Sequence, residues 1–149
     1  MAHYYDDGGN NMSAQDWNEI DRSSRQLLSC FLEKVGAQEI GEMTGNCCVD
    51  LSCMLNTKPV CIEIKDRNFE STKYGDILVE SLKQDCTTRR IMNGQFQVAL
   101  AVNVYTDNVI AIANLFDKQA KHFKRYAPVT TLVKGADHSY VQKEFCSLP

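Results

Sequence analysis

Two acidic residues and a lysine lie on neighbouring predicted strands, with a spacing that suits metal-assisted chemistry. Asp50 belongs to the apolar stretch 46–55, and Glu63 and Lys65 belong to the stretch 60–65. Two carboxylates held close together repel each other unless a cation neutralises them, and Mg²⁺ commonly binds one or two carboxylates while keeping waters for substrate phosphates. A lysine beside such an ion is able to hold or deprotonate a bound water, or to stabilise negative charge on a phosphate. The three residues therefore predict a site for phosphate chemistry.

The residues between the two stretches indicate a β-hairpin that would bring these side chains together. Residues 56–59, Asn-Thr-Lys-Pro, are a turn signal. A hairpin around this turn that places Asp50 opposite Lys65 also places Ser52 opposite Glu63, and directly paired residues of an antiparallel ladder point to the same face. The other face would then be apolar, formed by Val49, Leu51, Ile62 and Ile64. The alternative is an ordinary exposed strand face, on which Lys65 forms a salt bridge with Asp50 or Glu63.

Hydrophobic spacing predicts the helices and strands that would hold this hairpin. The strongest helix signal covers 13–35, where apolar residues from Trp17 to Val35 recur on one face, and Gly36 ends it. A second helix is predicted at 74–92. The remaining predicted elements are strands at 97–105 and 109–116 that form a hairpin, a short basic helix at 117–126, and a closing pair of strands at 129–133 and 140–145.

This order of elements predicts a mixed α/β sandwich with one sheet at its centre. Residues 1–12 are polar and rich in glycine and asparagine, so we expect a flexible N-terminal arm there. Nothing in the sequence of residues 13–149 marks a domain boundary, and a chain of this length can form a single core. We therefore expect one domain over 13–149.

The pattern of Asp50, a gap, and then Glu63-Ile-Lys65 after an apolar strand resembles the PD-(D/E)xK nuclease superfamily. The segments 65–83 and 128–145 are similar to small phage and prophage nucleases of that superfamily. The resemblance implies a restriction-endonuclease-like core of α/β class, with a central mixed β-sheet flanked by helices, in the order helix, three-strand meander, helix, strand. It also implies that Asp50, Glu63 and the backbone carbonyl of Ile64 bind Mg²⁺ or Mn²⁺. A further acidic ligand often comes from the first helix, where Glu19 is the best-placed candidate.

Several charged residues outside this motif are candidates for contact with substrate phosphates. A basic cluster lies in the predicted third helix, and other candidates lie in the loop and helix that follow Lys65. The alternative for the basic cluster and for the polar stripe of the second helix is a solvated surface. The substrate-binding candidates are Arg67, Lys73, Tyr74, Glu80, Lys83, Lys118, Lys121, Lys124 and Arg125.

The function that we expect is a divalent-metal-dependent nuclease of phage or prophage type, acting on DNA rather than RNA, with a homodimer as a plausible assembly. In this interpretation Asp50 and Glu63 bind the metal, and Lys65 assists the attacking water. The first alternative is a catalytically inactive protein of the same fold that binds nucleic acid or inhibits a partner protein. The second is a metal-binding or interaction protein that uses its cysteines.

Composition limits the class of protein, the kind of partner and the cellular location that we expect. Of 149 residues, 44% are hydrophobic and 23% are charged, which is typical of a globular domain. The formal net charge of −3 means that nucleic acid would have to bind a local basic face or a metal-filled acidic pocket. We expect no membrane contact, a cytoplasmic location in a bacterial or phage-infected cell, and seven cysteines that are mostly reduced and buried. A soft-metal site and a disulfide are the alternatives for the cysteines.

Overall fold

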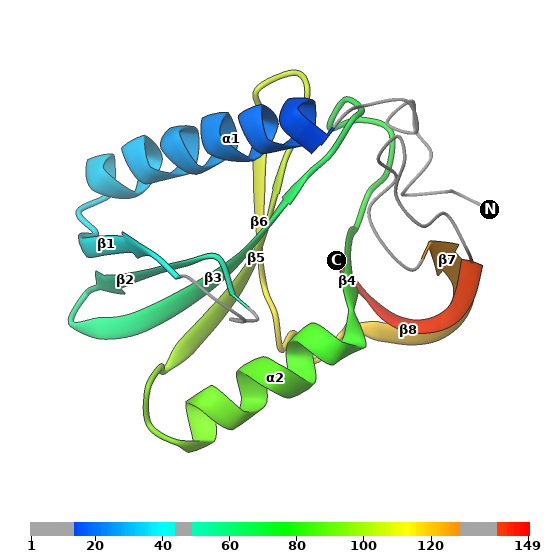
Figure 1. The fold of residues 1–149 in the computed structure, drawn as a ribbon. Coiled ribbons are helices and arrows are strands. Elements are labelled where there is room, and N and C mark those ends of the chain that lie inside the picture. Colours follow the sequence, from blue (N-terminus) through cyan, green and yellow to red (C-terminus); the bar gives the residue numbers. More distant parts are fainter. Residues whose placement is uncertain (1–13, 44–48, 129–139) are drawn as a thin grey trace.

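A computed structural model describes residues 14–43, 49–128 and 140–149 of the chain. The predicted arm at 1–12 and the predicted strand at 129–133 lie outside these residues. The described residues form two helices and eight strands (Figure 1). In chain order the elements are α1 (Ala14–Lys34), β1 (Gln38–Glu42), β2 (Leu51–Leu55), β3 (Lys58–Asp66), β4 (Ile77–Glu80), α2 (Ser81–Met92), β5 (Val98–Val104), β6 (Ile110–Asn114), β7 (Lys121–Pro128) and β8 (Tyr140–Leu148).

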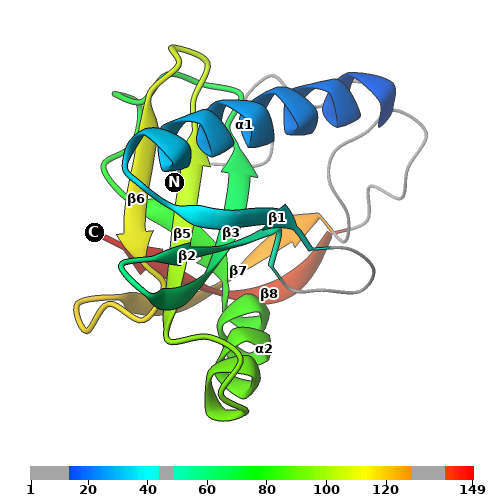
Figure 2. The same ribbon diagram turned by 90° about the vertical axis from the view of Figure 1, so that its left-hand side faces the viewer.

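The strands belong to two sheets. The first has the order β1-β2-β3-β5-β6, and the second has the order β4-β8-β7. In the first sheet β3 and β5 are parallel and the other neighbours are antiparallel, so this sheet is mixed. Because parallel neighbours need a crossover, the chain leaves the first sheet after β3, forms β4 and α2, and returns as β5 (Figure 2).

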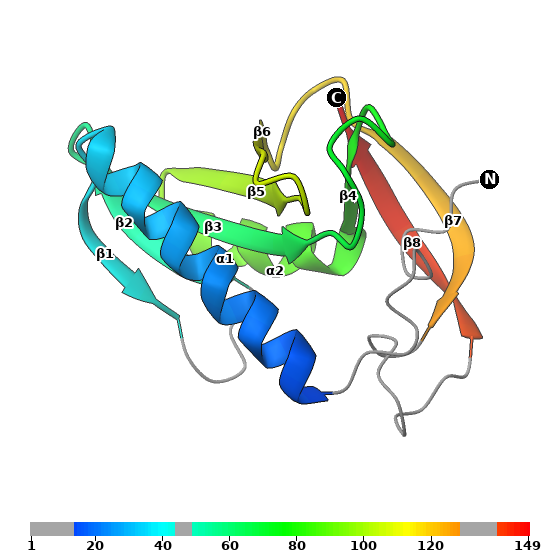
Figure 3. The ribbon, with the colours of Figure 1, turned by 90° about the horizontal axis from the view of Figure 1, so that it is seen from above.

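Each face of the first sheet has its own hydrophobic core. On one face, Leu28 and Leu32 of α1 pack against Leu51, Ile62 and Val102. On the other face, the sheet packs against α2 and the second sheet, through a cluster whose buried members include Cys61, Ala99, Ala101, Val79, Cys146 and Leu148. Seen from above, α1 crosses the first sheet obliquely, and β4, β8 and β7 lie together at the opposite side of the molecule (Figure 3). Along β3, Ile62 points to the α1 side and Cys61 to the α2 side. Because side chains alternate along a strand, Glu63 faces α2 rather than α1.

The predicted α/β class, with a central mixed sheet flanked by helices, is confirmed. The first helix and the hairpin of β5 and β6 lie where the sequence places them, and Gly36 follows α1 with a φ of 88°. The expectation of one sheet is wrong, because β4, β7 and β8 form a separate sheet. Strand β1, which pairs with the outer side of β2, was not predicted from the sequence.

Two predicted helices differ in the structure. The segment predicted as a helix at 117–126 is mostly β7, and the segment 77–80 at the start of the predicted second helix is β4. Phe123 lies opposite Phe145 in the ladder of β7 and β8, with their rings 6.0 Å apart. A strand gives this aromatic side chain a buried partner across the ladder, whereas a short polar helix would bury little apolar surface.

The apolar face of α1 is narrower than predicted. Leu28 and Leu32 are buried, but Leu27 and Phe31 of the helix and Val35 directly after it are exposed. The apolar residues that recur at helical spacing therefore form a stripe wider than the side of the helix that contacts the sheet. Within the described ranges, neither helix combines the length and the apolar character that crossing a bilayer requires.

The cysteines follow the prediction in part. Cys53, Cys61 and Cys146 are free and buried, and burial raises the pKa of Cys61 and of Cys146 to about 11. These thiols therefore act as small hydrophobic side chains, as expected. The expectation of reduced cysteines is wrong for Cys86 of α2, which is disulfide-bonded.

Candidate active site

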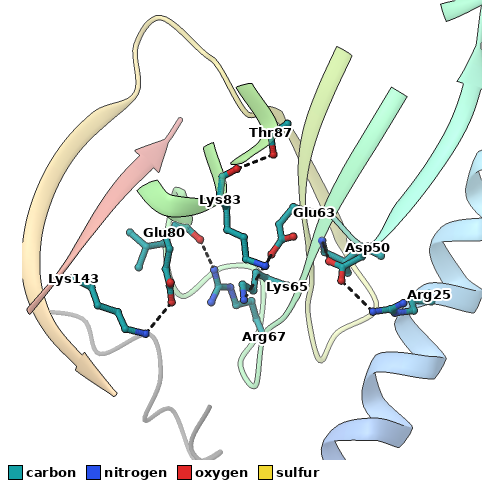
Figure 4. Close-up of polar contacts among 11 residues, drawn as sticks. Arg25, Asp50, Glu63, Lys65, Arg67, Glu80, Lys83, Thr87 and Lys143 are labelled. Atoms are coloured by element: carbon teal, nitrogen blue, oxygen red, sulfur yellow. Dashed lines mark hydrogen bonds and ion pairs between the residues drawn. The ribbon is translucent and has the colours of Figure 1, made fainter. Parts of the chain in front are cut away.

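Asp50 lies directly before β2, and both its backbone and its side chain extend the hairpin with β3. Its amide donates a hydrogen bond to the Ile62 carbonyl at 2.9 Å, and its Oδ2 accepts one from the Ile64 amide at 2.7 Å. Its carboxylate is thereby fixed at the edge of β3. Figure 4 shows it next to Glu63.

The register of the hairpin differs by two residues from the predicted one. Leu51 pairs with Ile62 rather than with Ile64, and Asp50 lies directly before this first pair, with its amide bonded to the Ile62 carbonyl. The turn contains Asn56 and Thr57, with φ values of 50° and 65°, and is therefore one residue earlier than expected. A shift of two keeps the side chains of the paired residues on their predicted faces, and the Asp50 carboxylate lies beside Glu63. The predicted face is wrong for Val49, which packs with Cys61 on the α2 side while Leu51 packs on the α1 side, because the alternation of side chains is interrupted at Asp50.

Glu63 is a buried carboxylate in the middle of the molecule, only 3% exposed. Burial raises its pKa from 4.5 to about 7. The negative charge of Asp50 and a hydrogen bond to Asp50 also raise this pKa, while the ammonium groups of Lys65 and Lys83 lower it. Its Oε2 is buried and has no hydrogen-bond partner among the described residues.

Two lysines approach the same oxygen of Glu63. Lys65, two residues later on β3, has its Nζ 3.9 Å from Glu63 Oε1, and Lys83 of α2 has its Nζ 3.5 Å from that oxygen. The structure thus brings together Asp50, Glu63 and Lys65, and it adds Lys83 from the predicted polar stripe. Glu80 does not join them, because its Oε1 lies 3.2 Å from Lys143 Nζ of β8.

The arrangement of Asp50, Glu63 and Ile64 fits a hard divalent cation. Within a strand, the N–H and C=O of one residue point to the same neighbour. The Ile64 amide points to the Asp50 carboxylate, so the Ile64 carbonyl points to that edge as well. The free oxygen of Glu63 is a third oxygen donor, and Mg²⁺ prefers oxygen ligands. Among the described residues, no group of three or more His, Cys, Asp or Glu side chains gathers in a form that would hold a metal.

From α1, the structure brings Arg25 to this site and not Glu19. The Nη2 of Arg25 lies 3.1 Å from Asp50 Oδ1. Glu19 is six residues earlier, about 9 Å along the helix axis. It lines a cleft of about 740 Å³ together with Asp66 and Asn68. A role for Glu19 as a metal ligand therefore stays a prediction that no contact with Asp50 or Glu63 supports.

The predicted phosphate-binding residues of the β3–β4 loop lie in different environments. Arg67 is buried, and its Nη2 donates a hydrogen bond to the Leu78 carbonyl at 2.8 Å, which ties the loop to β4. Lys73 is exposed, and its Nζ lies 5.5 Å from the centre of the Phe69 ring and 5.4 Å from that of Tyr74. Lys73 and Tyr74 thus form a small cationic and aromatic surface.

The basic residues predicted on a third helix lie on and before a strand. Lys118 precedes β7, and Lys121 and Lys124 are exposed on it. Arg125 is buried, with its guanidinium 5.7 Å from the centre of the Phe145 ring. Of this predicted group, Arg125 therefore packs within the protein, while the three lysines are accessible to a phosphate backbone.

Two residues with notable contacts were not predicted from the sequence: Arg25, which contacts Asp50 at the site, and Lys143, which contacts Glu80 outside it. A signal for Arg25 exists, because it precedes the buried Leu28 by three residues and Leu32 by seven, which places it on the same face of α1. An arginine at the end of a buried helical stripe needs an acidic or polar partner. No comparable signal identifies Lys143, because its approach to Glu80 depends on the pairing of β4 with β8.

Comparisons with known proteins identify no family for this chain. No family model matches the sequence, and no curated protein matches it. One solved structure is partly similar, that of Hjc from Archaeoglobus fulgidus, a Holliday junction resolvase from an archaeal hyperthermophile. It has a TM-score of 0.48 and 18% sequence identity, over 63% of this chain and 70% of that chain.

Proposed function

We propose that this protein is a divalent-metal-dependent nuclease of the PD-(D/E)xK type that hydrolyses phosphodiester bonds, preferably in DNA. The observation that carries this proposal is the meeting of Asp50, directly before β2, with Glu63 and Lys65 of β3. Lys65 approaches Oε1 of Glu63, and Oε2 of Glu63 is buried and lacks a hydrogen-bond partner among the described residues. A carboxylate is costly to bury without compensation. A divalent cation at that oxygen would compensate it and would place phosphate chemistry at the same point.

The residues of the chain have separable roles in this proposal. Asp50 and Glu63, with the Ile64 carbonyl, would hold Mg²⁺ or Mn²⁺. When bound, such an ion supplies a Lewis acid for a phosphoryl oxygen and lowers the pKa of a bound water. Asp50 is held by the Ile64 amide, so its carboxylate is oriented before any ligand arrives. This preorganisation favours catalysis, because no reorganisation of the acid is needed during the reaction.

Lys65 is the proposed catalytic lysine. It shares its face of β3 with Glu63, and its side chain is about one-third exposed, so it reaches from the buried carboxylate toward solvent. An ammonium has donors and no acceptor, so Lys65 acts by orienting a water or by stabilising charge on the phosphate. Lys83 is closer to Glu63 and helps to keep this carboxylate ionised.

DNA would be held by residues away from the acids. Lys118, Lys121 and Lys124 are exposed near or on β7, and Lys73 is exposed beside Tyr74. Basic side chains on a surface make contacts to phosphates that do not depend on base sequence. A homodimer remains a further expectation, which sedimentation equilibrium of the purified protein would test.

Cleavage assays with matched variants test the proposal. Closed circular and linear DNA, and RNA, are incubated with the protein and Mg²⁺, Mn²⁺ or EDTA. We expect cleavage of DNA with either ion and none with EDTA, and we expect Asp50→Asn and Glu63→Gln to be inactive. Glu70→Gln, at an exposed loop glutamate, is the control and should cleave normally.

Two results would count against the proposal. Cleavage that survives in both site variants would show that the chemistry lies elsewhere. Binding of DNA by the wild-type protein without any cleavage, under all metal conditions, would favour the alternative of an inactive protein with a nuclease fold. Gel shifts of the same samples, run beside the cleavage assay, separate these two results.

A further inference from the structure

Arg25 projects from α1 to the outer side of the Asp50 carboxylate (Figure 4). Its Nη2 lies 3.1 Å from Asp50 Oδ1, and its Nη1 lies 3.6 Å from Oε1 of Glu42, the last residue of β1. The guanidinium thus stands between the acid that precedes β2 and an acid of the neighbouring strand. This is a position that a metal cation would otherwise favour.

Asp50 does not need Arg25 to keep its position. Its amide donates to the Ile62 carbonyl, its own carbonyl accepts from the Met43 amide, and its Oδ2 accepts from the Ile64 amide. These hydrogen bonds are between 2.7 and 2.9 Å long and fix both the backbone and the side chain. The contribution of Arg25 to the site is therefore its charge rather than the orientation of Asp50.

The charges around Asp50 leave room for one divalent ion but not for two. Glu63, beside Asp50, has a buried Oε2 without a hydrogen-bond partner among the described residues, whereas Oδ1 of Asp50 already faces the guanidinium of Arg25. In the part of the chain that the structure describes, no third acidic, histidine or cysteine side chain completes a larger metal-binding group here. A second ion on the Oδ1 side, between Asp50 and Glu42, would meet the positive charge of Arg25.

We propose that Arg25 is a fixed positive charge in the place of a second metal ion, so that each chain binds one divalent cation between Glu63 and Asp50. The inference rests on the proposed function, since it takes metal binding by these two acids as its starting point. Arg25 also repels the ion that does bind, because the two positive charges share the Asp50 carboxylate. The metal affinity is therefore lower than that of the same two acids without the arginine.

Calorimetric titration with Mn²⁺ in the absence of DNA tests this inference without depending on activity. We expect one Mn²⁺ per wild-type chain. Arg25→Gln should bind Mn²⁺ about tenfold more tightly, because a charge close to the ion is removed. Arg22→Gln is the matched control, since it removes an exposed arginine one turn earlier on α1, and its affinity should equal that of the wild type. Arg25→Glu should bind a second ion, because it adds an acid beside Asp50 and Glu42.

The outcomes separate this inference from the proposed function. Two ions per wild-type chain would overturn the inference and leave metal-dependent cleavage intact. Weaker binding by Arg25→Gln, with an unchanged circular dichroism spectrum, would overturn it as well, because the arginine would then position Asp50. No binding by any of the proteins would overturn the inference and the metal dependence together. Binding by Arg25→Gln alone would overturn the inference, because the wild-type chain would then bind no ion, and it would count against metal-dependent cleavage by the wild type as well.

Discussion

Replacing Glu63 by glutamine should stabilise the folded protein at alkaline pH and abolish cleavage at the same time. Glu63 is nearly fully buried, and burial raises its pKa from 4.5 to about 7. Glutamine has almost the same shape but carries no charge. The variant therefore lacks a buried group that has to ionise as the pH rises, and it also lacks the carboxylate that a metal would need.

The raised pKa determines the sign and the size of this effect. Because the folded protein binds the Glu63 proton more tightly than the unfolded chain does, the contribution to stability is complete below about pH 4.5 and is lost as the pH rises to about 7. Between pH 5 and pH 8, these two pKa values give a loss of about 2.5 kcal/mol in the free energy of unfolding. For a chain of this length, that corresponds to about 5–10 °C in melting temperature.

Thermal unfolding in EDTA, followed by circular dichroism at pH 5, 6, 7 and 8, measures this difference. The melting temperature of Glu63→Gln should rise relative to that of the wild type across the series, whereas Glu70→Gln, at an exposed position, should run parallel to the wild type. Parallel curves for the wild type and Glu63→Gln would refute the reasoning, because Glu63 would then titrate as an ordinary exposed acid.

Three other predictions concern basic residues. Lys65→Ala should slow DNA cleavage roughly 10²–10⁴-fold in a plasmid assay and retain Mn²⁺ binding by calorimetry, and normal cleavage would reduce the lysine to a salt-bridge partner of Glu63. Lys83→Met removes a positive charge 3.5 Å from Glu63, so the pKa of Glu63 should rise and the acidic limb of the pH–rate profile should move to higher pH; an unmoved limb would contradict this. Replacing Lys121 and Lys124 by glutamine should lower the salt dependence of DNA binding by about one unit of slope for each lysine that binds a phosphate, and an unchanged slope would assign both lysines to solvent.

The convergence of the charged residues is predictable from the sequence because strand alternation is robust. The hairpin differs by two residues from the predicted register, but an even shift leaves the side chains of the paired residues on their faces, and Asp50 and Glu63 still meet. The register itself depends on the turn type. A two-residue turn with positive φ at Thr57 is not signalled by the sequence, because a β-branched residue rarely adopts that conformation.

Other parts of the structure depend on contacts between segments far apart in the chain. The basic segment at 117–126 has a helical pattern of charges, but it pairs as β7 with β8, and only that pairing places Phe123 over Phe145. Arg25 has a local signal in the helix, but its partner Asp50 is 25 residues away. A sequence pattern indicates which face of a helix or strand is apolar, whereas tertiary packing decides which segment of the chain contacts that face.

The central strand of the second sheet, β8, is close to the C-terminal end of the sequence, so it is synthesised late. β8 lies between β4 and β7, and its Phe145, Cys146 and Leu148 are fully buried. Ile77 of β4 pairs with Leu148, and the hydroxyl of Ser147 donates a hydrogen bond to Asp76. On a translating ribosome, α1, β1, β2 and β3 emerge long before residues 140–148. The layer that supports α2 and its Lys83 therefore closes only after β8 has emerged, so a nascent chain that lacks these residues carries Asp50 and Glu63 without a finished site.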